Sequence, residues 1–162
     1  MLEFITDINQ FKFVTFETTP SLPTYVYAIV VGPYKFYEMA EEDGMPPMRI
    51  YARPSLIEEV PHEEMFKVTK AGIKFYSELF GQKYPFGKYD QVFVPEDIYG
   101  AMENVGCVTY AEINIYSGDY KSMAKRLRTQ IRNLHELCHM WFGNMVTMKW
   151  WNDLWLNEAF AS

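Results

Sequence analysis

The residues best suited to chemistry in this sequence are two histidines four positions apart, His135 and His139, with Glu136 directly after the first. On a helix, positions i and i+4 project from one face, so both imidazoles can reach one ion. Such a pair commonly binds Zn²⁺. Glu136 would lie beside the ion and accept a proton from a water whose pKa the ion lowers. A chain of this composition contains H-E-x-x-H about 0.005 times by chance, so we predict a catalytic zinc site.

A catalytic zinc site needs a third protein ligand and keeps its fourth position open. Glu158 is the candidate, because 18 residues separate it from His139 and a turn at Gly143 and Asn144 would let a second helix return to the first. Two histidines and a glutamate are the ligand set of thermolysin-type peptidases. Spacing alone leaves open that Glu158 is an exposed helix residue. Asp153 is either the N-cap of the second helix or an acceptor for a ligand histidine.

The elements that must hold these residues follow from proline positions and hydrophobic spacing. All nine prolines lie between Pro20 and Pro95, which predicts strands and turns first and long helices later. Helices are predicted over residues 61–80 and 122–142, with a last one starting near residue 152. Strands are predicted over residues 12–17, 24–31, 48–52, 90–94 and 107–110. Strands followed by helices indicate the α+β class.

The helix over residues 122–142 is expected to bury an apolar stripe and to expose a basic face. The stripe has steps of three or four residues and consists of Met123, Leu127, Ile131, Leu134, Cys138 and Trp141. The basic face consists of Lys121, Lys125, Arg126, Arg128 and Arg132, and we interpret it as solvated. Trp150, Trp151 and Trp155 are expected in the core around the third ligand.

Composition excludes several classes of protein. The 162 residues carry a formal charge of −6, and an acidic chain is a poor binder of nucleic-acid phosphates, so we expect no nucleic-acid partner. The longest apolar run, residues 25–31, is far too short for a membrane segment. Two cysteines, Cys107 and Cys138, indicate reduced thiols and a cytoplasmic protein rather than a disulfide scaffold.

Two motifs, the second of which has two parts, resemble those of the zinc aminopeptidases typified by aminopeptidase N and occur in the same order. The segment 100–104, Gly-Ala-Met-Glu-Asn, lies upstream of the H-E-x-x-H segment 135–139, and Asn-Glu-Ala-Phe follows at 157–160. The similarity runs over roughly residues 24–162, most of the chain. We therefore expect a member of this family that hydrolyses the N-terminal peptide bond of peptides.

The resemblance implies a role for each motif residue. One Zn²⁺ would be bound by His135, His139 and Glu158, with Glu136 as the catalytic base. The substrate-binding residues would be Gly100, Ala101, Met102, Glu103 and Asn104. Among these, Glu103 would bind the free α-amino group of the peptide, and the Gly100 and Ala101 backbone would pair with the substrate as an edge strand. A fixed carboxylate suits this task, because it recognises a terminal ammonium by a charge-assisted hydrogen bond.

The resemblance also implies how the chain divides into domains. Residues 1–45 would be the last strands of an N-terminal β domain, and residues 46–162 the N-terminal half of a thermolysin-like catalytic domain with a mixed sheet and zinc-binding helices. A polar connector over residues 41–47 marks the boundary. In this interpretation the chain is a fragment, truncated within the catalytic domain, and inactive alone.

Three other functions remain open from the sequence. The epoxide-hydrolase branch of the family shares both motifs, although Ala101 favours the peptidase over the Gly-Gly-Met-Glu-Asn form of that branch. A thermolysin-like endopeptidase would leave Glu103 without a role. A non-catalytic homologue that binds zinc and peptide is disfavoured, because the complete set of metal-binding and catalytic residues is present.

Overall fold

A computed structural model describes residues 2–8, 11–40, 42–96, 99–116 and 122–162. The strands are β1 (Leu2–Ile8), β2 (Phe11–Phe16), β3 (Lys35–Glu38), β4 (Arg49–Ala52), β5 (Gln91–Val94), β6 (Ala101–Met102) and β7 (Val108–Ala111). The α-helices are α1 (His62–Phe80), α2 (Ile113–Tyr116), α3 (Met123–Cys138) and α4 (Leu154–Ala161). Short 3₁₀ turns cover Thr24–Val26, Ile57–Glu59 and Trp151–Asp153.

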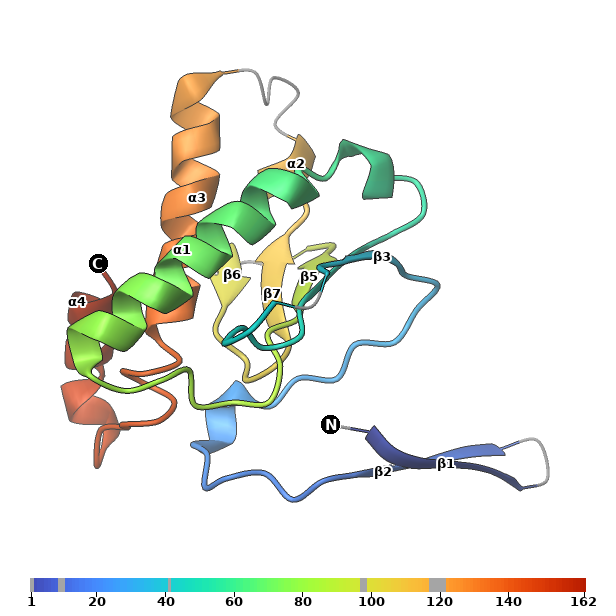
Figure 1. The fold of residues 1–162 in the computed structure, drawn as a ribbon, viewed down its shortest axis with the longest axis horizontal. Helices are drawn as coiled ribbons and strands as arrows, with labels where there is room; N and C mark the ends of the chain where they lie inside the picture. The colour runs from blue at the N-terminus through green and yellow to red at the C-terminus, as the bar shows by residue number, and fades with distance from the viewer. Residues whose placement is uncertain (1, 9–10, 41, 97–98, 117–121) are drawn as a thin grey trace.

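Five of the strands form one mixed sheet in the order β3-β4-β5-β7-β6 (Figure 1). The central strands β4, β5 and β7 are parallel, and β3 and β6 are antiparallel edge strands. The hairpin of β1 and β2 lies apart from this sheet in Figure 1. A mixed sheet with helices confirms the predicted α+β class. No helix among the described residues combines the length and the apolar character that a bilayer crossing needs.

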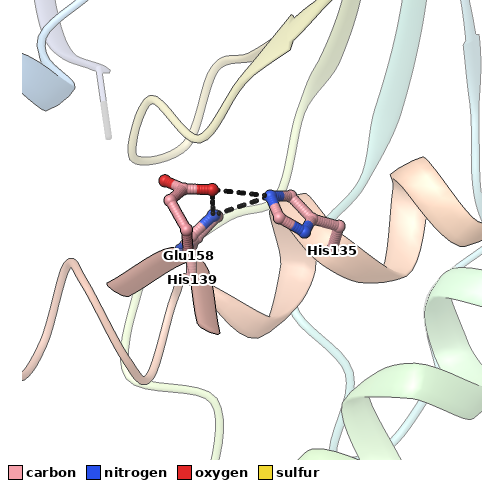
Figure 2. Close-up of side chains that lie close together, drawn as sticks. All are labelled: His135, His139 and Glu158. Atoms are coloured by element: carbon pink, nitrogen blue, oxygen red, sulfur yellow. Dashed lines mark hydrogen bonds and ion pairs between the residues drawn. The ribbon is translucent and has the colours of Figure 1, made fainter. Parts of the chain in front are cut away.

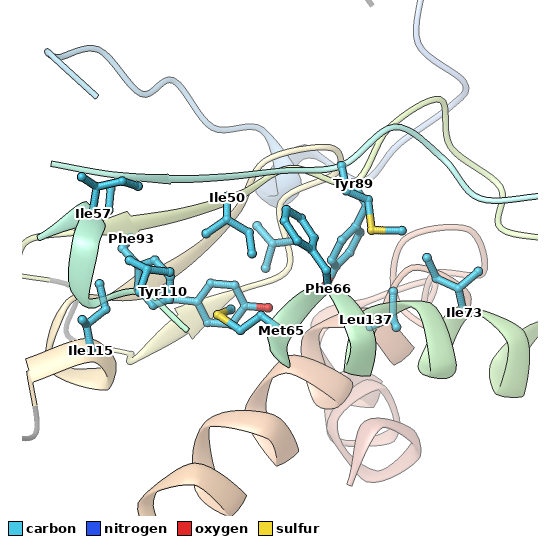
Figure 3. Close-up of a cluster of buried hydrophobic side chains, with 14 of the residues drawn as sticks. Ile50, Ile57, Met65, Phe66, Ile73, Tyr89, Phe93, Tyr110, Ile115 and Leu137 are labelled. Atoms are coloured by element: carbon cyan, nitrogen blue, oxygen red, sulfur yellow. The ribbon is translucent and has the colours of Figure 1, made fainter. Parts of the chain in front are cut away.

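Helix α1 supplies the centre of the hydrophobic core (Figure 3). Its side chains Met65, Phe66 and Ile73 belong to the same buried cluster as Ile50 of β4 and Phe93 of β5. Apolar residues recur on one face of α1, so the helix lies with that face on the sheet. Each fully buried side chain of this kind contributes about 1.5–3 kcal/mol.

Helices α1 and α3 pack closely where α1 carries Gly72. A Cβ at this position would lie 2.6 Å from Leu137 Cδ2 and 2.7 Å from Leu134 Cδ2, so the approach requires a residue without a side chain. Leu137 is completely buried. The contact fixes the rotation of α3 about its own axis, and therefore decides which of its side chains face the cavity described below.

The predicted apolar stripe of α3 is only partly buried, so this prediction is wrong for half of the helix. Its first three members, Met123, Leu127 and Ile131, are 74%, 57% and 57% exposed. The face that α3 turns inward is instead largely polar and consists of Thr129, Gln130, Asn133, Glu136, Leu137 and Cys138. The helix also ends at Cys138, four residues earlier than predicted.

Hydrogen bonds across the helix contact explain the polar inner face. Asn133 Nδ2 donates to Thr69 Oγ1 of α1 at 3.0 Å, and Gln91 Nε2 lies 3.4 Å from the same hydroxyl. All three side chains are completely buried. Buried polar groups that satisfy one another cost little, whereas an apolar side chain at Asn133 would leave the threonine hydroxyl short of a partner.

The other predicted elements are confirmed with one exception. Helix α1 and strands β2, β4, β5 and β7 occupy the predicted segments, and α4 starts after Asp153. The segment 24–31 is not a strand: it holds a 3₁₀ turn and irregular backbone, with Ile29 and Val31 about nine-tenths exposed. Its β-branched residues gain nothing from an extended conformation without a neighbouring strand.

The tryptophans near the end of the chain were expected in the core, and this expectation is wrong. Trp150, Trp151 and Trp155 are 68%, 55% and 65% exposed. Trp151 packs on Tyr25, with 5.6 Å between the ring centroids. The domain boundary near residue 45 stays a prediction, and the sheet places β3 directly beside β4 on either side of it.

Replacement of Gly72 by alanine tests the helix contact. Gly→Ala in an open helix stabilises by about 0.5–1 kcal/mol. Here we expect the opposite sign, a loss of about 1–3 kcal/mol in the free energy of unfolding, because the new methyl group overpacks Leu134 and Leu137. Denaturant unfolding of the complete protein measures the change. A Gly72→Ala variant as stable as the wild type would show that α1 and α3 can separate without cost.

Candidate active site

Three potential metal ligands from two helices meet at one point (Figure 2). His135 lies in α3, and Glu158 lies in α4. His139 is the first residue after the end of α3 and keeps helical backbone angles. The two Nε2 atoms are 3.1 Å apart, and Glu158 Oε2 lies 3.2 Å from His135 Nε2 and 3.8 Å from His139 Nε2. The convergence expected from the spacing is therefore present, and ligation by these residues stays a prediction.

Hydrogen bonds at the opposite ring nitrogens fix the tautomer of both histidines. His135 Nδ1 donates to the carbonyl oxygen of Ala161 at 3.1 Å, and His139 Nδ1 donates to Asn157 Oδ1 at 2.8 Å. A neutral imidazole with a proton on Nδ1 has a bare lone pair on Nε2. Burial, and then the neighbouring His139, lower the pKa of His135, so the neutral form that binds metals is favoured.

The donor set fits zinc in chemistry and in spacing. Two imidazole nitrogens and one carboxylate oxygen are the ligands of many catalytic zinc sites. Bonds of 2.0–2.2 Å in a tetrahedral arrangement separate ligand atoms by about 3.3–3.6 Å. The observed separations, 3.1 to 3.8 Å, bracket this range. Two bare lone pairs and a carboxylate oxygen at such distances repel one another unless a cation lies between them.

Asn157 connects the two candidate ligand histidines to the rest of the site. Its side chain is buried, and its Oδ1 accepts the hydrogen bond from His139. Its Nδ2 lies 3.5 Å from Glu103 Oε1 and 3.5 Å from the Tyr25 hydroxyl oxygen. Asn157 lies in a sequence motif, but the motif did not predict this hydrogen bond; Asp153 was expected as either the N-cap of the last helix or the acceptor for a ligand histidine. Asp153 is exposed and makes no capping bond with its side chain.

Gly143 makes room for Asn157. It has a φ of 130°, and a Cβ there would lie 2.3 Å from Asn157 Oδ1. A side chain at this position would displace the amide from His139. The next residue, Asn144, donates from Nδ2 to the backbone carbonyl of Glu103 at 2.8 Å. The turn after α3 therefore supports both the candidate ligand His139 and the segment that carries Glu103.

A cavity of about 490 Å³ is lined by His135, His139 and Glu158, the three candidate metal ligands. One wall comes from the edge strand β6, through Ala101, Met102 and the following Glu103. The floor comes from α3, through His135 and Glu136. Because β6 is an edge strand, an extended peptide in this cavity can add to the sheet there.

Two buried carboxylates lie beside the metal-binding atoms. Glu103 and Glu136 are 6% and 5% exposed, and together with His139 they offer ligand atoms within 4.8 Å of one another. Burial also raises the pKa of Tyr25 to about 12, and the charges of Glu103 and Glu158 add to the rise. The site thus concentrates negative charge, as the neighbourhood of a bound cation or ammonium group requires.

The predicted substrate-binding residues divide into two groups. Ala101, Met102 and Glu103 line the cavity, whereas Gly100 and Asn104 do not. Asn104 is buried, and its Nδ2 donates to Thr109 Oγ1 of β7 at 3.3 Å. Asn104 and Gly100 therefore hold the strand in place, and a direct substrate contact of either stays a prediction.

The basic face of α3 is not the fully solvated surface that the sequence predicted. Arg128 and Arg132 line the cavity, and Arg132 is half-buried. Lys121 lies outside the described residues. The signal that could have found the two arginines is their spacing, because Arg128, Arg132, His135 and His139 follow one another in steps of four, three and four.

Known proteins are similar to this sequence over most of its length. Residues 64–162 match the family described as Peptidase family M1 domain. The chain is 48% identical over 149 residues to "Aminopeptidase N" of Streptomyces lividans, covering 91% of this chain and 17% of that protein. It is 40% identical over 148 residues to "Aminopeptidase N" of Rattus norvegicus, covering 91% and 15%. It is 36% identical over 161 residues to "Probable aminopeptidase 2" of Sulfurisphaera tokodaii, covering 99% and 20%.

The chain corresponds to a short part of each of these relatives. The chain spans only 15% to 20% of the length of these curated relatives. The similarity therefore applies to this segment and to the candidate site that it contains.

Replacement of Asn157 by alanine tests the hydrogen bond behind His139. We expect zinc affinity to fall about 10–100-fold, as is typical when an acceptor that orients a ligand histidine is removed. Competition with a chelator measures the affinity in the complete protein. The matched control is Asn152→Ala, because Asn152 is exposed and its side-chain amide donates to the neighbouring Asp153. Equal affinities in both variants would contradict the orienting role.

Proposed function

The chain belongs to peptidase family M1, and from this premise we propose that the complete protein is a zinc-dependent aminopeptidase. It would hydrolyse the N-terminal peptide bond of peptides with a free α-amino group. The observation that carries the proposal is one cavity in which three metal-binding atoms, two buried carboxylates and an edge strand meet. The relatives named above are aminopeptidases, so the epoxide-hydrolase and non-catalytic alternatives are not favoured.

We propose that His135, His139 and Glu158 hold one zinc ion. When bound, zinc supplies Lewis acidity, which polarises a carbonyl group and lowers the pKa of a water molecule. The protein contributes orientation. Asn157 and the Ala161 carbonyl hold the two imidazoles with their Nε2 atoms toward Glu158, and each acceptor lies within 3.1 Å of its Nδ1 atom.

Glu136 is proposed as the general base and acid. Its carboxylate is buried and lines the cavity floor directly beside the His135 ligand. There it accepts a proton from the attacking water, whose oxygen forms the new bond to the scissile carbonyl carbon. The carbon–nitrogen bond then breaks, and Glu136 returns the proton to the leaving amine nitrogen.

Glu103 is proposed to bind the α-ammonium group of the substrate. Its carboxylate is buried at the end of β6, near Asn157 Nδ2, and its backbone carbonyl is held by Asn144. A buried carboxylate gains from an ammonium partner, because the two charges satisfy each other where water is excluded. The fixed distance between Glu103 and the metal-binding atoms would make the enzyme an exopeptidase.

The variant Glu136→Gln tests the proton-transfer role in the complete protein. Zinc content should remain at the wild-type level when the ion is held by His135, His139 and Glu158, because Glu136 belongs only to the second cluster, with Glu103 and His139. Turnover should fall about 10²–10⁴-fold, since glutamine cannot carry the proton. Metal analysis and steady-state kinetics measure the two quantities, with Glu63→Gln as an exposed control. Loss of zinc together with activity would assign Glu136 to ligation instead.

Amine capture is tested by Glu103→Ala. With a free α-amino substrate, kcat/KM should fall by the equivalent of about 2–5 kcal/mol, the cost typical of a truncated buried charge pair. Any residual hydrolysis of the N-acetylated peptide should be unaffected, because that substrate has no ammonium group to lose. Kinetics on the matched pair of peptides give both values. A uniform loss on both substrates would refute selective recognition of the amine.

A further inference from the structure

Two arginines extend the row of metal-binding histidines along the cavity. Arg132 and Arg128 precede His135 by three and seven residues on α3. At a helical rise of 1.5 Å per residue, they lie about 4.5 and 10.5 Å from His135 toward the start of the helix. Both line the same cavity as Glu103 and Glu158. The cavity is therefore acidic at the metal-binding end and basic at the other.

The charges of these arginines have no carboxylate partner in the part of the chain that the structure describes. Arg132 Nη1 donates to Asn114 Oδ1, which is a neutral amide oxygen. No ion pair of Arg128 or Arg132 occurs among the described residues, whereas Arg126 on the same helix pairs with Glu64 at 3.0 Å. A half-buried guanidinium without a counter-charge favours an anion that enters the cavity.

Arg132 is held in place by the same residue that holds the start of β6. Asn114 Nδ2 donates to the carbonyl oxygens of Gly100 and Ala111, at 3.0 and 2.9 Å. The guanidinium carbon of Arg132 lies 3.3 Å from the point where a Gly100 side chain would begin. Arg132 is therefore oriented before any ligand arrives, which lowers the entropic cost of binding.

The positions of Arg132 and Glu103 define a length along the edge strand. Gly100 beside Arg132 and Glu103 at the other end flank the two-residue strand β6 and are three residues apart, which corresponds to at most about 10 Å along the chain. A substrate with its ammonium group at Glu103 must run antiparallel to β6 to reach the Gly100 end. Two or three extended residues span about 7–11 Å. A negative charge at that distance from the N-terminus would meet Arg132.

We infer that Arg132, assisted by Arg128, selects substrates with a carboxylate one or two residues beyond the scissile bond. This inference rests on the proposed aminopeptidase function. The carboxylate can come from the C-terminus of a dipeptide or tripeptide, or from an Asp or Glu side chain at the second or third position. In both cases the guanidinium can accept it in a bidentate arrangement.

The experiment compares matched peptides that differ only in this charge, using the complete protein. Ala-Ala and Ala-Ala-Ala are compared with their C-terminal amides, and Ala-Glu-amide with Ala-Gln-amide. The first two pairs report on a C-terminal carboxylate and the third on a side chain. The variants are Arg132→Gln and Arg128→Gln, with Arg132→Lys as the charge-conserving variant. The control is Arg126→Gln, which removes the same charge from α3 outside the cavity.

We expect wild-type kcat/KM to favour at least one charged peptide over its neutral partner by about tenfold or more. Arg132→Gln should abolish that preference, so that its kcat/KM values for the charged and the neutral peptide of each pair become equal. Arg132→Lys should keep part of the preference, and Arg126→Gln all of it. Equal rates on charged and neutral peptides in the wild type, or a preference that survives Arg132→Gln, would overturn the inference while leaving the proposed function intact.

A binding measurement separates this inference from the proposed function. Calorimetry gives the Kd of Ala-Ala and of its amide for the Glu136→Gln variant, in which turnover should be negligible. Tighter binding of the free acid, lost when Arg132→Gln is added, supports charge selection by itself. Equal Kd values for both ligands count against it. Absence of hydrolysis of every peptide by the wild type would instead refute the proposed aminopeptidase.

Discussion

The structure depends on the mutual approach of three electron-pair donors. Two imidazole nitrogens and one carboxylate oxygen lie 3.1 to 3.8 Å from one another. Each histidine carries its proton on Nδ1, where it is hydrogen-bonded to a carbonyl oxygen. Such an arrangement is unfavourable without a cation. The fold must therefore hold α3 and α4 together through contacts that lie elsewhere. Those contacts include the stacking of Phe142 on Phe160 and the hydrogen bond from Cys138 Sγ to the Phe160 carbonyl oxygen.

Hydrogen bonds of Asn157 and Asn144 couple the proposed metal centre to the proposed ammonium site. Asn157 touches both His139 and Glu103, and Asn144 holds the backbone of Glu103 from the turn that follows α3. A displacement of α4 would thus disturb the proposed metal ligands and the proposed ammonium site together. The polar inner face of α3 also positions the site. Its hydrogen bond from Asn133 to Thr69 fixes the rotation of the helix at which His135 lines the cavity.

Much of the site was predictable from the sequence because its chemistry is local. The four-residue step from His135 to His139 places both on one helical face wherever the helix lies. The strands of the central sheet and helix α1 were predictable for the same reason, since propensity and periodicity act over short segments. The family was recognisable from motifs for which the residue types and their order are sufficient.

Features that depend on which surfaces meet were decided by the tertiary structure. Residues 24–31 have strand propensity but gain no strand neighbour, and the apolar Met123 and Leu127 remain exposed while Asn133 is buried. The orienting role of Asn157 and the place of Arg132 in the cavity depend on partners 18 residues away or more. A sequence determines what each side chain can do within a turn or two, whereas long-range packing selects the partner with which it does so.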